Sequence, residues 1–121
     1  MIIHVALYRF RSDAPEEQVE ACIRELQSST RRTGLASWYL SGAHLPLPAD
    51  QTVRDMVYDF AALWGFADQQ ALDEFSRHPV IAQCVAMFIQ PILNRLAIVN
   101  FIETSDAHWQ LAGIEEQKHV S

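Results

Sequence analysis

Three polar side chains lie within apolar runs of the chain, and their types suit acid–base chemistry. His4 and Tyr8 lie four residues apart in the run 2–10, and Asn100 lies in the run 96–102. Histidine ionises near neutral pH and can move a proton, while a phenol and an amide can position a carbonyl or hydroxyl oxygen. We therefore predict a catalytic set in which His4 acts as acid or base and Tyr8 and Asn100 position the substrate.

Each of these side chains also has a purely structural alternative. A strand histidine can bond a backbone carbonyl, Tyr8 can pack in a subunit interface, and Asn100 can bridge two subunits. Two other histidines are expected to be structural: His78 precedes Pro79, where it would close a helix end, and His44 lies on a proline-rich loop.

Sequence motifs for metals and cofactors are absent. The five histidines include no i,i+4 pair and no H-E-x-x-H. The chain also lacks a glycine-rich phosphate loop, a G-x-S-x-G elbow and a C-x-x-C pair. These are the patterns through which zinc, nucleotide cofactors and serine hydrolase chemistry are recognised. We expect neither a metal nor a cofactor.

The elements that must position these residues follow from the periodicity of apolar side chains. Alternation and β-rich composition predict four strands, at 2–10, 35–43, 55–66 and 96–102. A capping sequence at 12–17 predicts a helix that is ended by Ser28-Ser29-Thr30 and Gly34, and Asp68 and Pro79 begin two more. The order β-α-β-β-α(α)-β predicts an α+β, ferredoxin-like fold, a four-stranded antiparallel sheet with helices on one face.

The other face of such a sheet has no helix to cover it. Both faces of three strands are apolar, and the side chains expected on the uncovered face include Tyr8, Phe10, Phe60, Trp64 and Ile98. His4 and Asn100 are expected on the same face. An aromatic patch of this size is rarely left to water, so it should meet a second subunit, a ligand or both.

Length and charge narrow the function classes. The chain has 121 residues, half of them apolar, which fits one domain over 1–103 followed by a tail, 104–121, with a possible short helix. A net charge of −6 opposes nucleic-acid binding, and no apolar run is long enough to span a membrane. The first residues lack a signal-peptide pattern, and Cys22 and Cys84 lie in apolar helical patterns. We therefore expect reduced thiols and a cytoplasmic location, with a disulfide as the alternative.

Four segments of the chain resemble the stress-responsive dimeric α+β barrel family. They are the first strand at 2–10, Tyr58-Asp59-Phe60-Ala61-Ala62, Phe75-Ser76-Arg77-His78-Pro79 and Ile98-Val99-Asn100-Phe101. The resemblance covers about residues 2–102. It implies a homodimer in which two sheets face each other around a barrel, and this arrangement would cover the apolar face.

The departures from the family pattern bear on chemistry. The family includes plant olivetolic acid cyclase, a polyketide cyclase without a cofactor. Its acid–base tyrosine and histidine correspond to Phe75 and Ile81 here, and a third-strand histidine corresponds to Phe60. Of the polar residues in the cyclase site, only the one that corresponds to His4 remains here. The resemblance therefore does not imply cyclisation by the same residues.

We predict a cofactor-independent enzyme that transfers protons in a cyclisation, isomerisation or elimination of a small apolar, aromatic or polyketide-like metabolite. The predicted wall of its binding site is made by Leu26, Phe60, Ala62, Trp64, Phe75, His78, Ile81, Phe88 and Ile98. Two alternatives stay open: a non-catalytic, stress-associated dimer that binds a small molecule, and a cofactor-free monooxygenase.

Overall fold

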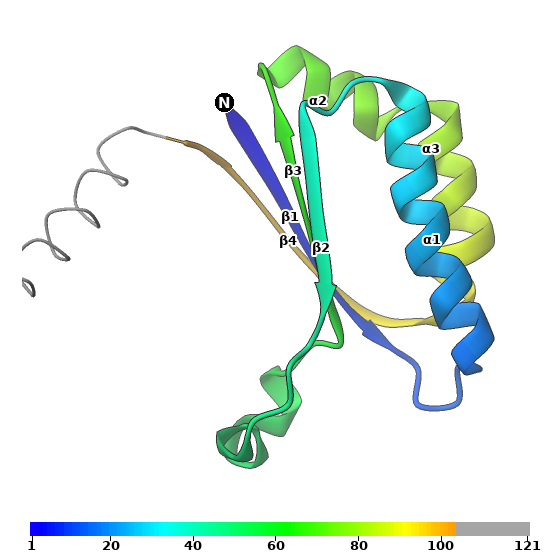
Figure 1. The fold of residues 1–121 in the computed structure, drawn as a ribbon, viewed down its shortest axis with the longest axis vertical. Coiled ribbons are helices and arrows are strands. Elements are labelled where there is room, and N and C mark those ends of the chain that lie inside the picture. Colours follow the sequence, from blue (N-terminus) through cyan, green and yellow to red (C-terminus); the bar gives the residue numbers. More distant parts are fainter. Residues whose placement is uncertain (104–121) are drawn as a thin grey trace, which may run out of the picture.

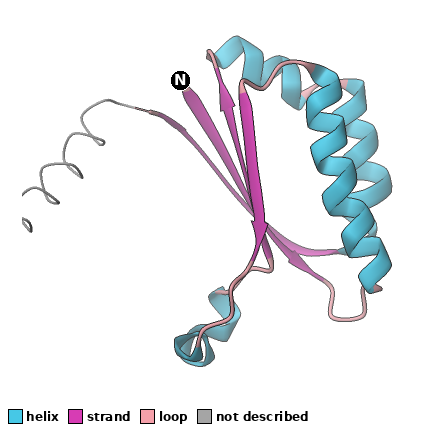
Figure 2. Ribbon diagram, viewed as in Figure 1, coloured by secondary structure: helices cyan, strands magenta, loops and turns pink. Residues whose placement is uncertain are grey.

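A single sheet with helices on one side forms the computed structural model, which describes residues 1–103 (Figures 1 and 2). Its strands are β1 (Ile2–Phe10), β2 (Trp38–Ala43), β3 (Phe60–Phe66) and β4 (Leu93–Ile102). Its helices are α1 (Glu16–Thr33), α2 (Gln69–Ser76) and α3 (Pro79–Cys84), and short helical turns continue α3 to Ile92. The strand order is β2-β3-β1-β4, and all neighbours are antiparallel. The predicted ferredoxin-like fold is confirmed, and the predicted tail, 104–121, lies outside the described residues.

Helix α1 ends at Gly34, the glycine that the sequence predicts at its end. It begins after Pro15, and the φ of +66° at Gly34 is the left-handed conformation that glycine adopts readily. The hydroxyl residues Ser28, Ser29 and Thr30 lie inside the helix rather than after it, and Thr30 is buried against the sheet. There its hydroxyl accepts a hydrogen bond of 2.9 Å from the Trp64 indole nitrogen. The hydrogen bond between Thr30 and Trp64 thus ties α1 to β3.

The connection between β2 and β3, residues 44–59, forms an arm that extends beyond the end of the sheet (Figure 1). A strand over 55–66 is predicted, but β3 begins only at Phe60, and Pro48–Met56 form a 3-10 helical segment. Asp50 holds this turn, because its Oδ2 accepts a hydrogen bond of 2.8 Å from the Leu47 amide. Such local bonds compete with a strand ladder.

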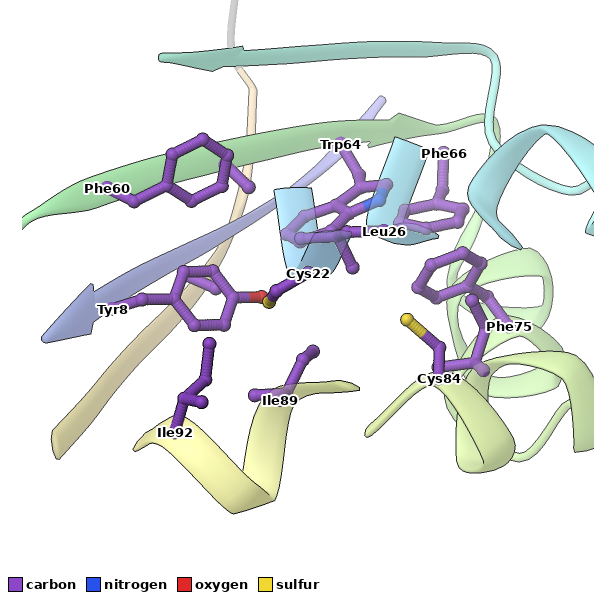
Figure 3. Close-up of a cluster of buried hydrophobic side chains, with 13 residues drawn as sticks. Tyr8, Cys22, Leu26, Phe60, Trp64, Phe66, Phe75, Cys84, Ile89 and Ile92 are labelled. Carbon is purple, nitrogen blue, oxygen red and sulfur yellow. The ribbon is translucent and has the colours of Figure 1, made fainter. Parts of the chain in front are cut away.

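The core lies between the sheet and the helices (Figure 3). Residues that face each other on antiparallel strands share one face, and Ala6 is opposite Ala62. The even-numbered side chains of β1 and β3 therefore point at the helices. Those buried there are Ala6, Tyr8, Phe60, Ala62, Trp64 and Phe66, packed with Cys22, Leu26, Phe75, Ile81, Cys84, Ile89 and Ile92.

This arrangement corrects the predicted assignment of faces. Tyr8, Phe60 and Trp64 are at most 5% exposed in the helix-covered core, not on the uncovered face. The uncovered face carries the odd-numbered side chains of β1 and β3 and their neighbours, including Val5, Leu7, Trp38, Leu40, Leu63, Val99 and Phe101. It is still apolar, so the inference that something covers it stands with different residues. In residues 1–103 no helix is long and apolar enough to cross a membrane.

Candidate functional site

His4 and Asn100 form a hydrogen-bonded pair across two neighbouring strands. They are directly opposite in the β1–β4 ladder, and the His4 Nδ1 bonds the Asn100 Oδ1. An amide oxygen only accepts hydrogen bonds, so the hydrogen lies on His4 Nδ1. In the neutral ring the lone pair is then on Nε2, which becomes the nitrogen that can accept a proton.

An aromatic neighbour fixes the other side of the His4 ring. The ring centroid lies 4.9 Å from that of Trp64, at an interplanar angle of 43°. Trp64 is itself buried, bonded to Thr30, and in ring contact with Tyr39 at 5.2 Å and Phe75 at 5.9 Å. The His4 ring therefore packs against a fixed indole.

The pair lies where the helix layer ends. His4 is half-buried, whereas Asn100 is exposed. Leu96 and Ile98 share the helix-side face of β4 with Asn100, and they are 41% and 55% exposed. The helices thus cover β1 and β3 but leave this face of β4 open, so the His4–Asn100 pair is accessible from solvent. His4 and Asn100 were predicted on the uncovered face, which is wrong, but the structure does bring them together.

Tyr8 is separated from this pair. It is opposite Leu96 and Phe60 and points into the core toward Cys22 (Figure 3). Burial, followed by the nearby Tyr39 and the two thiols, raises the pKa of the Tyr8 hydroxyl. It therefore stays protonated and can donate a hydrogen bond but not act as a base. Among the described residues, no contact joins Tyr8 to His4 or Asn100, so the predicted trio reduces to a pair.

The predicted wall residues are mostly packed core. Leu26, Phe60, Ala62, Trp64, Phe75 and Ile81 are buried in it, and Phe88 packs against it. Only Trp64 touches the His4 ring, and only Ile98 lies on the open part of β4. The accessible site therefore contains far fewer of these residues than predicted.

His78 has the structural role expected from its position before Pro79. Its Nδ1 accepts a hydrogen bond of 3.1 Å from the Val80 amide and so caps α3. The lone pair of that nitrogen is occupied by the cap. His78 was also predicted to line the binding site, but its described contacts are those of a helix cap.

Tyr39 is a residue that the sequence did not single out. Its hydroxyl is buried and has no hydrogen-bond partner of ordinary geometry among the described residues. Burial raises the pKa of Tyr39, and the Ser41 side chain lowers it in part. A buried hydroxyl without a partner is uncommon and indicates a place for water or a ligand oxygen. Its parity opposite Trp38 and Leu40 was visible in the sequence, but its depth was not.

The two thiols are free and buried, as predicted. Burial, followed by the neighbouring Cys84, raises the pKa of Cys22 to about 12, and burial also raises the pKa of Cys84. Neither is therefore a ready nucleophile at neutral pH. Within residues 1–103 no three His, Cys, Asp or Glu side chains converge in a way that could hold a metal ion.

Comparison with known proteins places this geometry in a family. The sequence profile of the stress responsive A/B barrel domain matches residues 2–103. No functionally curated protein matches the chain.

Several solved structures have the same fold. A dimeric ferredoxin-like protein of unknown function from Thermobifida fusca is 27% identical, with a TM-score of 0.71 over 84% of this chain and 90% of that one. The hydroxynitrile lyase of Passiflora edulis is 18% identical, with a TM-score of 0.73 over 86% and 94%. The Arabidopsis thaliana protein At3g17210 is 17% identical, with a TM-score of 0.73 over 87% and 97%.

Proposed function

The chain belongs to the stress responsive A/B barrel domain family, and from that premise we propose that it is a homodimeric, cofactor-independent enzyme. Its reaction is an acid–base conversion of a small, largely apolar metabolite that carries a hydroxyl or carbonyl oxygen. The observation that carries the proposal is the hydrogen bond between His4 Nδ1 and Asn100 Oδ1 beside Trp64.

The proposed mechanism follows from the tautomer that this bond selects. Asn100 holds the hydrogen on Nδ1, so His4 Nε2 can take a proton from the substrate. In the resulting imidazolium Nδ1 still donates to the amide oxygen, and the ring stays packed beside Trp64. Return of the proton to a different atom of the substrate completes an isomerisation or cyclisation, and its return to a leaving group completes an elimination. No net charge or electron is gained.

The relatives support this reaction class without fixing the substrate. The Passiflora edulis protein is named as a lyase, one of the reaction types in the proposal. Phe75 and Ile81 replace the tyrosine and histidine expected from cyclase-type members, so the chemistry here rests on the His4–Asn100 pair. An apolar or aromatic substrate of polyketide type fits the exposed Leu96 and Ile98 beside that pair.

The dimer rests on the uncovered sheet face. Leu40, Val99 and Phe101 are 63%, 53% and 48% exposed there. The relative from Thermobifida fusca is described as dimeric. A second copy seated on this face would remove these side chains from water, at roughly 25 cal/mol for each Å² of apolar surface.

Two free, buried thiols fit a reducing compartment, and we place the protein in the cytoplasm.

The test begins with identification of the substrate by native mass spectrometry of co-purified small molecules. With that substrate, His4→Gln should lower kcat by at least about 100-fold, the scale of general acid–base catalysis. Asn100→Ala removes the acceptor of the His4 hydrogen bond and should also lower kcat. Its matched control is Asn94→Ala, because Asn94 is an exposed amide on the same strand. Full turnover by a folded His4→Gln dimer would overturn the proposal.

A second candidate function is a dimer that binds a metabolite without converting it. It is favoured by the filled interior, where Tyr8, Phe60 and Trp64 are each at most 5% exposed. Binding of the co-purified molecule with no product between pH 5 and 9 would favour this function over catalysis.

A further inference from the structure

A cavity lies at the end of β1 that is far from His4. Its volume of about 570 Å³ is within the usual range for small-molecule sites. It is open to solvent and lies between the end of β1, the start of α1 and the β2–β3 arm. Arg9, at its edge, is five residues from His4, or roughly 17 Å along the strand. The cavity is thus separate from the site proposed above.

Three guanidinium groups line this cavity, those of Arg9, Arg11 and Arg54. Arg9 is held in place, because its Nε and Nη2 donate to the Val57 carbonyl at 3.0 and 2.6 Å. Arg11 donates through Nε and Nη2 to Asp13. Both leave Nη1 unused by these bonds. The Arg54 guanidinium has no hydrogen bond or ion pair within residues 1–103.

The carboxylates of the cavity are already committed to other groups. Asp59 Oδ2 accepts a hydrogen bond of 2.8 Å from the Phe10 amide. Asp50 Oδ2 accepts from the Leu47 amide and bonds His44 Nε2, each at 2.8 Å. These bonds, the backbone one first, lower the pKa of Asp50, so it is ionised at neutral pH.

The charge on Arg54 therefore has no local partner. Among the described residues no ion pair joins Arg54 to Asp59 or Asp50. The lining holds three arginines and two aspartates, so it carries one net positive charge in a chain whose net charge is −6. Such a site favours an anion, and a guanidinium binds a carboxylate through two parallel hydrogen bonds.

The remaining walls define the rest of the ligand. Phe10, Val19, Pro46 and Val57 line the same cavity and are apolar. A ligand that fills it must combine an anionic end with a compact apolar body. We propose that this cavity binds the carboxylate of a small organic acid, with Arg54 as the main charge partner and Arg11 as a second one. This site does not depend on the function proposed for His4.

The test is a titration of the full chain followed by ¹H–¹⁵N NMR, with benzoate as the probe. Benzamide serves as its neutral counterpart, and inorganic phosphate serves as an anion without an apolar body. Benzoate should shift the amide signals of residues 9–12 and 44–59, and its Kd should rise with added NaCl. Benzamide should bind at least about 10-fold more weakly, the scale of one charge-assisted contact.

Variants decide whether Arg54 is the charge partner. Arg54→Gln should weaken benzoate binding by about 10-fold, and Arg11→Gln by less, since Asp13 already engages that side chain. Arg24→Gln is the matched control, because Arg24 is an exposed arginine of α1 outside the cavity. Arg54→Gln and Arg24→Gln should both melt at the wild-type temperature, because neither arginine side chain makes a hydrogen bond or ion pair within the described part of the chain.

Several outcomes would overturn the proposal. They are no benzoate binding up to about 10 mM, equal binding of benzamide, binding of phosphate alone, or unchanged affinity in Arg54→Gln. A loss of turnover in His4→Gln with intact benzoate binding would separate the two sites. A wild-type protein that turns over its substrate but does not bind benzoate would leave the enzyme proposal standing and remove this one.

Discussion

The indole ring of Trp38 lies directly over Gly65 of the neighbouring strand. The two residues are opposite each other in the β2–β3 ladder, and a Cβ atom at Gly65 would sit 2.2 Å from the indole nitrogen. That nitrogen also donates to the Met1 sulfur at 3.0 Å. The absence of a side chain at Gly65 thus lets an aromatic ring lie flat on the uncovered face, in the row where Ile3 is only 6% exposed.

Gly65→Ala should therefore destabilise the protein by about 1–3 kcal/mol, because the added methyl group forces the Trp38 ring off the sheet. Urea denaturation followed by tryptophan fluorescence measures both the stability and the change around Trp38. Gly42→Ala is the control, since nothing lies within 4 Å of a Cβ built there. Equal stability of the two variants would contradict this account of Gly65.

The uncovered face gives a prediction about assembly. Leu40→Asp should convert the proposed dimer to a monomer of 13.8 kDa, because a carboxylate would be buried without a partner in the proposed interface. Light scattering at micromolar concentration measures the mass. Met87→Asp, which places the same charge on an exposed residue of the helical layer, should stay dimeric. A monomeric wild type would remove the dimer from the proposal.

Much of the fold can be predicted from the sequence, and the errors have identifiable causes. Alternation predicted β1, and the apolar run 96–102 predicted most of β4, which begins three residues earlier, at Leu93. Parity also grouped Phe60 with Trp64 correctly. It could not say which face the helices cover, because a period of two is the same for both faces. That choice depends on how α1 crosses over between β1 and β2, a property of three dimensions.

The candidate site was predicted in part for a similar reason. His4 and Asn100 were chosen independently as polar residues in apolar strands, but their pairing depends on the β1–β4 register, which a single sequence does not reveal. Tyr8 has the same parity as His4, yet it is 5% exposed because the helices cover its end of β1. Parity tells which face of the strand a side chain is on, but its burial on that face depends on where the helix layer stops.

The buried weak acids of the core predict how stability changes at high pH. Burial raises the pKa of Cys22 from 9.0 to about 12 and also raises the pKa values of Tyr8, Tyr39 and Cys84. Above pH 9 the unfolded chain loses these protons and the folded chain keeps them, so the folded state becomes less stable as pH rises toward 12. The free energy of unfolding should fall by up to about 1.4 kcal/mol per pH unit for each group.

Urea denaturation at half-unit steps from pH 8 to 10.5 measures this slope. Cys22→Ala should make it shallower, whatever its effect on stability at pH 8. A free energy of unfolding that is constant over this range would show that the core does not hold these groups in their neutral form.

The hydrogen bond between His4 and Asn100 makes a prediction that needs no substrate. Because the Asn100 amide oxygen can only accept, the neutral His4 ring should carry its hydrogen on Nδ1, and ¹⁵N chemical shifts of the imidazole should report that tautomer. Asn100→Leu removes the acceptor and should shift the ring toward the Nε2–H tautomer. Asn94→Leu, on the same strand, should leave the tautomer unchanged. An Nε2–H ring in the wild type would mean that Nε2 is not the base, and the proposed proton transfer through that nitrogen would then fail.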